Sequence, residues 1–185
     1  MIFIAEVKTN SPFGYKSKNS WQNLFDIAKT YGDWISIHTD PRWGGSFDLI
    51  SRARQQTRKP ILAKGIHASD LDIDKALELG ANYVLVVGRT VPESIAPFCL
   101  HEPNTLDSLI RTPHDYKAVW NIRDLNTGAD KPWTYDLARQ KFAGWLCQAS
   151  RIRSPADVHP LADAILVGEN LQAYIQSVTG AAKRP

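Results

Sequence analysis

Residues 60–87 read PILAKGIHASDLDIDKALELGANYVLVV, and this stretch decides the fold class. It begins and ends with a short apolar run, and an amphipathic segment lies between the two runs. Such an arrangement predicts two parallel strands joined by a helix. Ser69, with Asp72 three residues later, predicts the start of that helix, and Gly80 predicts its end.

The same alternation extends along the whole chain. The apolar runs that predict strands occupy residues 2–7, 34–38, 60–63, 83–87, 98–101, 118–121, 144–147 and 164–167. The segments that predict helices occupy residues 21–30, 47–56, 69–79, 105–111, 134–141, 154–159 and 171–178. Eight strands with intervening helices predict an α/β protein, a compact (β/α)8 TIM barrel that forms a single domain over residues 1–185.

The barrel is predicted to be shortened at one place. The 185 residues fall below the usual minimum of about 200 for this fold. Only residues 88–97, which include two prolines, join the fourth and fifth strands, whereas a parallel crossover needs at least about 10–12 residues. We therefore predict a vestigial fourth helix. Because the first predicted strand begins at residue 2, we also expect no N-terminal extension before the barrel.

Composition narrows the class of protein. With 43% hydrophobic and 22% charged residues, the chain is typical of a compact, soluble globular protein. The net charge of +3 is spread along the sequence, which favours a small anionic ligand over nucleic acid. The apolar opening is too short for a membrane span and lacks the features of a signal peptide. Two cysteines outside any CxxC pattern indicate a reducing compartment, so we expect a cytoplasmic protein with no membrane partner. The five histidines lack a metal-ligand spacing, which predicts no metal site.

Polar residues follow several predicted strands, where a barrel of this type carries its reactive groups. Glu6 and Lys8 are two residues apart in the first strand, so their side chains share one face. A carboxylate among lysines suits acid catalysis on an anionic substrate, because burial and nearby charges set the proton affinity of each ammonium group. The other candidates at strand ends are Lys64, Asn121, Arg123, Ser150 and Gly168, with Trp43 as the best aromatic candidate for ligand contact.

Several segments, in order along nearly the whole chain, resemble indole-3-glycerol phosphate synthase of tryptophan biosynthesis. They are IAEVKTNSPFG (4–14), ISIHTDPRWGGSF (35–47), residues 59–87, WNIRDL (120–125), SRIRSPADV (150–158) and AILVGENL (164–171). The resemblance implies conversion of 1-(2-carboxyphenylamino)-1-deoxyribulose 5-phosphate into indole-3-glycerol phosphate, with loss of carbon dioxide and water and without a cofactor. The implied partners are a small phosphorylated substrate and other tryptophan-pathway enzymes.

The resemblance also implies roles for individual residues. Lys64 would be the general acid, Lys8 would offset the substrate carboxylate and assist dehydration, and Glu6 would orient both lysines. Asn121 and Arg123 would lie near the hydroxyl and carboxylate side of the substrate. The remaining implied contacts are Ser11 at the anthranilate end and a phosphate cradle made of Ser150, Gly168 and the backbone amide of Glu169.

The chain departs from the family pattern beside Lys64, where Asp-Phe is replaced by Gly65 and Ile66, and also in the fifth and seventh strands. The family has a fifth-strand glutamate, a general base, two residues before His or Asn, and we align that position with Cys99, before His101. A thiol is a poor replacement for a carboxylate. His101 or Glu102 would have to substitute, although strand alternation is expected to place Glu102 on the opposite face. At the end of the seventh strand, Glu-Ser-Gly is replaced by Ala149, Ser150 and Arg151, and Arg151 is a further candidate for phosphate binding.

These departures leave two alternatives to the synthase reaction. The first is a catalytically silent barrel that binds a phosphorylated ligand. The second is an enzyme that uses Lys8 and Lys64 on a different phosphorylated metabolite, for isomerisation or aldol-type cleavage.

Overall fold

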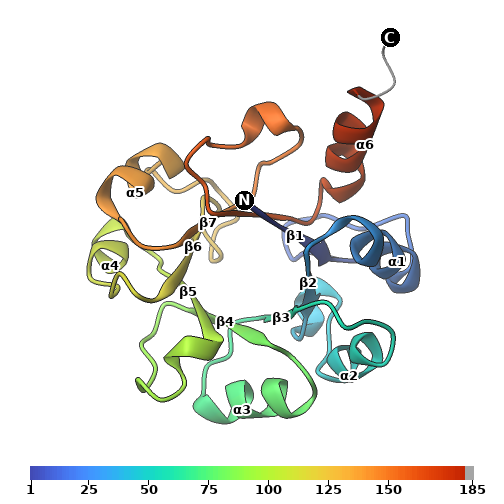
Figure 1. The fold of residues 1–185 in the computed structure, drawn as a ribbon, viewed down its shortest axis with the longest axis horizontal. Helices are drawn as coiled ribbons and strands as arrows, with labels where there is room; N and C mark the ends of the chain where they lie inside the picture. The colour runs from blue at the N-terminus through green and yellow to red at the C-terminus, as the bar shows by residue number, and fades with distance from the viewer. Residues whose placement is uncertain (182–185) are drawn as a thin grey trace.

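The strands form a closed barrel in which all neighbouring strands are parallel (Figure 1). The computed structural model describes residues 1–181, and β8 pairs with β1 to complete the ring. This arrangement confirms the predicted (β/α)8 fold. The strands are β1 (Ile2–Val7), β2 (Trp34–His38), β3 (Ile61–Lys64), β4 (Tyr83–Val87), β5 (Cys99–Glu102), β6 (Lys117–Asn121), β7 (Leu146–Ala149) and β8 (Ala164–Val167).

Helices surround the barrel on its outside (Figure 1). In the described part of the chain they are α1 (Trp21–Tyr31), α2 (Asp48–Arg54), α3 (Asp70–Glu78), α4 (Leu106–Ile110), α5 (Tyr135–Lys141) and α6 (Leu171–Ala181). Local sequence explains where α3 starts, because Ser69 and Asp72 form the predicted reciprocal capping box. The backbone of Gly80 has a φ of 102°, a conformation that glycine adopts readily after a helix.

Two of the connections between strands contain only a short 3-10 helix. Between β4 and β5 this is η2 (Ala96–Phe98), which confirms the vestigial fourth helix. Between β7 and β8 it is η3 (Pro155–Asp157), so the helix predicted over residues 154–159 is wrong. The sequence does supply a helix start there, because Ser154 and Asp157 cap each other. The turn ends at once because His159 precedes Pro160, and a residue before proline disfavours the helical conformation.

Alternation along the strands separates two layers of core. One apolar cluster, which includes Ile4, Leu62, Leu100 and Val119, fills the barrel interior. Other clusters, built on the alternate residues of the same strands, pack against the surrounding helices. Two residues beyond four of the interior apolar residues, a polar side chain emerges at the carboxyl end of the barrel. The pairs are Ile4 and Glu6, Leu62 and Lys64, Leu100 and Glu102, and Val119 and Asn121.

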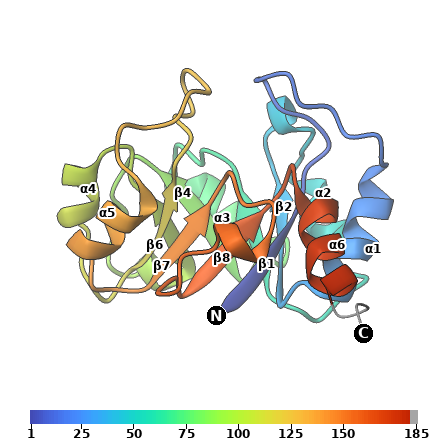
Figure 2. The ribbon, with the colours of Figure 1, turned by 90° about the horizontal axis from the view of Figure 1, so that it is seen from above.

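Loops rise above the carboxyl end of the barrel. Figure 2 shows the connections after β1 and after β6 standing above the same face. They approach each other closely, since a Cβ added to Gly128 of the second loop would meet the ring of Phe13 in the first at 2.5 Å. The two loops therefore border the space over the strand ends. Within residues 1–181, no helix is both long enough and apolar enough to cross a membrane.

Candidate active site

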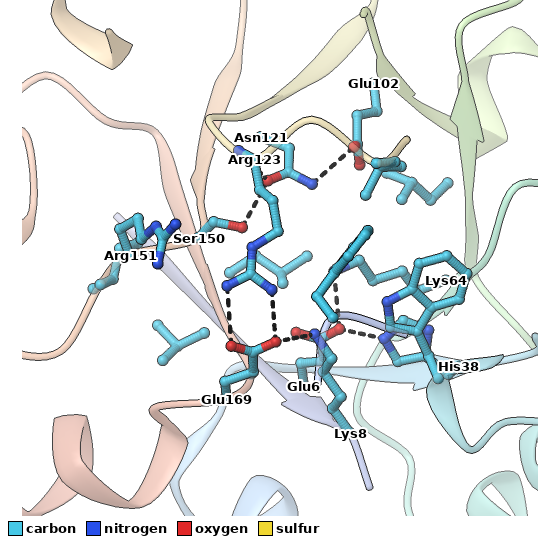
Figure 3. Close-up of a pocket in the computed structure, with 18 of the residues that line it drawn as sticks. Glu6, Lys8, His38, Lys64, Glu102, Asn121, Arg123, Ser150, Arg151 and Glu169 are labelled. Atoms are coloured by element: carbon cyan, nitrogen blue, oxygen red, sulfur yellow. Dashed lines mark hydrogen bonds and ion pairs between the residues drawn. The ribbon is translucent and has the colours of Figure 1, made fainter. Parts of the chain in front are cut away.

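A pocket at the carboxyl ends of the strands brings most of the predicted site together (Figure 3). Every predicted site residue except Ser11 lines it: Glu6, Lys8, Lys64, Asn121, Arg123, Ser150, Arg151, Gly168 and Glu169. Ser11 is buried in the loop after β1, where its hydroxyl accepts a hydrogen bond from the backbone N–H of Phe13 at 3.2 Å. This contact lies within the loop, so Ser11 stabilises the loop and does not line the pocket.

Glu6 is the centre of a buried hydrogen-bond network. Lys64 Nζ donates to Glu6 Oε1 at 2.8 Å, and Nε2 of His38 binds the same oxygen. Burial alone would raise the pKa of Glu6, but the charges of Lys64 and His38 outweigh it and hold that pKa well below its ordinary value. The glycine at position 168 is required here, because a Cβ would collide with the Glu6 carboxylate. Glu6 is therefore a fixed anion.

The two lysines of the pocket differ in their affinity for a proton. Burial lowers the pKa of Lys8, and the nearby carboxylates of Glu6 and Glu169 only partly oppose this effect. Burial acts in the same direction on Lys64, but the charges of Glu6 and Glu102 outweigh it and raise the pKa of Lys64. Lys64 is thus held as an ammonium ion, whereas Lys8 releases its proton more readily.

Glu102 faces the pocket, which corrects the expectation that it lies on the opposite face. Its Oε1 accepts from Asn121 Nδ2 at 2.9 Å, and its buried Oε2 has no hydrogen-bond partner among the described residues. Burial raises the pKa of Glu102, although Lys64 and the bond from Asn121 oppose the rise. Asn121 in turn accepts a hydrogen bond from Ser150 Oγ at 2.6 Å. A carboxylate whose pKa is raised in this way is a better proton acceptor than an ordinary glutamate.

Cys99 and His101 face away from the pocket, contrary to the expectation that Cys99 takes the position of the family's general base and that His101 can substitute for it. The Cys99 thiol donates to the Ile95 carbonyl at 3.4 Å, and burial raises its pKa to about 11. His101 lines a separate groove on the outer wall, with its ring stacked on Tyr116, and burial lowers its pKa to about 4. The reason is register: Leu100 fills the barrel interior, so alternation places Glu102 on the inner face.

Sequence reasoning had a signal for Glu102 and missed it. The expected spacing of a glutamate two residues before His or Asn is present at Glu102 and Asn104. It also missed His38, which lines the pocket and stacks on Trp43 with ring centroids 6.0 Å apart. Trp43, the predicted aromatic candidate, lines the pocket as well. Nothing in the apolar run around His38 distinguished it from a structural histidine.

The connection after β7 has an unusual backbone. Ser150 and Arg151 have φ values of 70° and 60°, in the left-handed region that favours glycine. Arg151 takes the place of the expected glycine and still adopts that conformation. Its guanidinium is paired with Asp130, with Nε to Oδ1 at 2.9 Å, at the exposed rim of the pocket. Arg153 lines the same rim.

The side chain of Glu169 is a part of the site that the sequence did not reveal. It was predicted to act through its backbone amide, but its carboxylate also lies between Lys8 and Arg123 (Figure 3). Burial alone would raise the pKa of Glu169, but the hydrogen bonds from Arg123 and Lys8 lower it to about 2. The pocket therefore contains a second ionised carboxylate in addition to Glu6.

Comparison with known proteins relates this geometry to one family. The family model "Indole-3-glycerol phosphate synthase" matches residues 1–107. An indole-3-glycerol phosphate synthase of Thermococcus kodakarensis is 32% identical over 113 residues, which cover 58% of this chain and 49% of that relative. The synthase of Caldanaerobacter subterraneus is 27% identical over 200 residues, covering 92% of this chain and 75% of the relative. The chain thus spans about half the length of the first of these two relatives.

Solved structures support the fold. A 3-hexulose-6-phosphate synthase matches 94% of this chain and 100% of its own, with a TM-score of 0.65 and 16% sequence identity. A likeness at this identity bears on the barrel architecture alone.

Proposed function

The chain belongs to the indole-3-glycerol phosphate synthase family, and on this premise we propose that it is a carbon–carbon lyase of tryptophan biosynthesis. The proposed reaction is the decarboxylative ring closure of 1-(2-carboxyphenylamino)-1-deoxyribulose 5-phosphate to indole-3-glycerol phosphate. The observation that supports it most strongly is the convergence of Lys64 and Lys8 around the buried Glu6, with Lys64 Nζ 2.8 Å from the carboxylate.

Lys64 is proposed to act as general acid in the first step. The ring carbon that carries the carboxylate attacks the substrate carbonyl carbon, and the carbonyl oxygen takes a proton from the Lys64 ammonium group. The C–C bond to the carboxylate then breaks, carbon dioxide leaves, and its electron pair restores the aromatic ring. The ion pair with Glu6 keeps Lys64 protonated before the reaction, which supports this assignment.

Lys8 and Glu102 are proposed to act in the dehydration. The new hydroxyl group takes a proton from Lys8 and leaves as water. Glu102 takes a proton from the adjacent carbon of the new five-membered ring, the carbon bonded to nitrogen, as the indole double bond forms. The lowered pKa of Lys8 makes it the better proton donor to a leaving group, and the raised pKa of Glu102 makes it the better acceptor. Glu102, rather than Cys99, is therefore the proposed base.

The side of the pocket near β7 and β8 is proposed to bind the substrate. Arg123 and Asn121 would contact the carboxylate and hydroxyl side. Ser150, Gly168 and the backbone N–H of Glu169, just before α6, would hold the phosphate, with Arg151 at the rim. Backbone N–H groups at the start of a helix favour an anion, which supports this placement. Association with other tryptophan-pathway enzymes stays a prediction.

The test is turnover of the proposed substrate by purified protein, followed by the fluorescence of the indole product. We expect product with the unmodified chain and with Lys141→Ala, a matched substitution of an exposed lysine at the end of α5. Lys64→Ala should abolish detectable turnover. Absence of product from the unmodified chain at high concentration would refute the synthase assignment.

Two observations favour a second candidate, a catalytically silent barrel that binds a phosphorylated ligand. The expected strand-seven glutamate is Ala149, which packs in the apolar interior, and the carboxylate of Glu169 already lies on the basic groups of the pocket. This candidate predicts saturable binding of the same substrate without product, and weaker binding in Arg151→Ala. Measurable turnover would exclude it, and turnover of another sugar phosphate alone would favour the third possibility, a different phosphorylated metabolite.

A further inference from the structure

The carboxylate of Glu169 occupies a binding position formed by two cations of the pocket. We propose that Glu169 is an internal counter-ion that the carboxylate of a ligand must displace from Lys8 and Arg123, and that it thereby determines ligand specificity. The inference rests on the proposed function only for the type of ligand, an aromatic carboxylate.

The contacts resemble those that a bound carboxylate would make. Arg123 donates from both terminal nitrogens, to Glu169 Oε1 at 2.7 Å and to Oε2 at 3.0 Å, and Lys8 Nζ donates to Oε1 at 2.7 Å. The two-point contact of a guanidinium with a carboxylate is a strong and geometrically specific interaction. Lys8 follows β1 and Arg123 follows β6, so Glu169 joins opposite parts of the pocket mouth (Figure 3).

Of the three partners, Glu169 is the one suited to move. Its side chain is 22% exposed, compared with 8% for Lys8 and 13% for Arg123. It also lies in the short connection between β8 and α6, outside regular structure. The other pocket carboxylate that meets a lysine, Glu6, is only 4% exposed and is held by Lys64 and His38. A ligand would therefore displace Glu169 and leave Glu6 in place.

The size of the pocket supports displacement. The space within it is about 110 Å³, whereas sites for ligands of this kind usually measure about 300–1,000 Å³. Movement of the Glu169 side chain away from Lys8 and Arg123 enlarges the pocket and exposes both cations together. A ligand carboxylate then replaces one anion by another, so the charge beside the two cations is preserved. A ligand without an anionic group cannot make this exchange.

Binding of anthranilate, measured by its fluorescence, tests the proposal, with aniline as the matched ligand that lacks the carboxylate. Glu169→Gln keeps the shape of the side chain and removes its charge, so we expect anthranilate to bind about tenfold more tightly. Asp74→Asn, an exposed carboxylate on α3, is the control for the change in net charge and should leave the affinity unaltered. The affinity for aniline should not change in either variant. Equal or weaker binding of anthranilate by Glu169→Gln would overturn the proposal.

A second variant guards against a folding defect. Glu169→Asp keeps the charge on a shorter side chain that cannot reach both cations, so it should bind anthranilate more tightly than the unmodified chain does and less tightly than Glu169→Gln. If Glu169→Gln does not fold, an unchanged affinity of Glu169→Asp overturns the proposal. Binding can be measured without turnover, so the two proposals can be tested separately. Tighter anthranilate binding by Glu169→Gln, with no synthase activity in the unmodified chain, would refute the proposed reaction alone. Synthase activity in the unmodified chain, with no tighter binding by Glu169→Gln, would refute the counter-ion role of Glu169 alone.

Discussion

Residues 1–107, which match the family model, and residues 108–181 contribute different groups to the pocket. The matched part supplies the groups suited to proton transfer, namely Glu6, Lys8, His38, Lys64 and Glu102. The remaining part supplies basic and hydrogen-bonding groups at the rim, with Glu169 as their internal anion. The groups proposed to transfer protons thus come from the matched part, and most of the groups proposed to hold the ligand come from the remaining part. If these roles are correct, substitutions in the matched part should affect kcat, and substitutions in the other part should affect ligand affinity.

The largest effect is expected at Glu102. Glu102→Gln removes the proposed base while keeping the hydrogen-bonding shape, so kcat for ring closure should fall by about 10²–10⁴-fold. Cys99→Ser is the matched control on the same strand, because Cys99 faces the helical layer. It should leave kcat within about twofold of the unmodified chain, since the thiol lies outside the pocket. Steady-state kinetics of both variants shows which residue acts as the base. A larger loss of kcat in Cys99→Ser than in Glu102→Gln would contradict the orientation of the β5 side chains in the structure.

The pH profile tests the proton-transfer groups as a set. Glu102 must be ionised to accept a proton, and burial raises its pKa, so activity should fall with decreasing pH at values above the ordinary 4.5 of glutamate. Lys8 must be protonated to donate, and burial lowers its pKa, so activity should fall with increasing pH below the ordinary 10.5 of lysine. Each limb should approach a tenfold change per pH unit.

Lys8→Arg provides the control for the alkaline limb. An arginine stays protonated throughout the accessible range, so this limb should move to higher pH in the residual activity of the variant. An alkaline limb that stays in place would show that another group is responsible for it.

The sequence predicted the fold and most of the pocket because both depend on local patterns. Apolar runs located the strands to within about two residues, and the residue pairs at strand ends located Glu6, Lys8, Lys64 and Asn121. The prediction of which β5 side chains face the pocket was wrong. The motif can be placed at Cys99 and His101 or at Glu102 and Asn104, and these placements differ by three residues. Because side chains alternate along a strand, an odd shift moves every side chain to the other face. The role of the Glu169 side chain was missed for a different reason. Its contact with Lys8 joins residues that are 161 positions apart in the sequence, and no local pattern predicts such a contact.

A moderate effect is expected at Arg151, in the ligand-holding part. Arg151→Ala removes a guanidinium from the rim near the proposed phosphate site, so KM for the phosphorylated substrate should rise by about five- to tenfold with kcat nearly unchanged. Asp130→Asn is a useful companion, because it frees Arg151 from its ion pair and should lower KM or leave it unchanged. A fall in kcat without a change in KM in Arg151→Ala would instead place this residue with the reaction groups.

The smallest effect is expected on stability, at the same position. Arg151→Gly relieves the left-handed backbone at φ 60°, which costs a residue with a Cβ about 1 kcal/mol. It also loses an exposed ion pair with Asp130, worth about 0–1 kcal/mol, and makes the unfolded chain more flexible by about 0.4–1 kcal/mol. These contributions nearly cancel, so the free energy of unfolding in urea should change by less than about 1 kcal/mol.

Gly168→Ala is the contrasting variant, because its Cβ would collide with Glu6 and should destabilise the fold by about 1–3 kcal/mol. If Arg151→Gly were the more destabilising of the two, Arg151 would be needed for the stability of the barrel. Its assignment to ligand binding alone would then be contradicted.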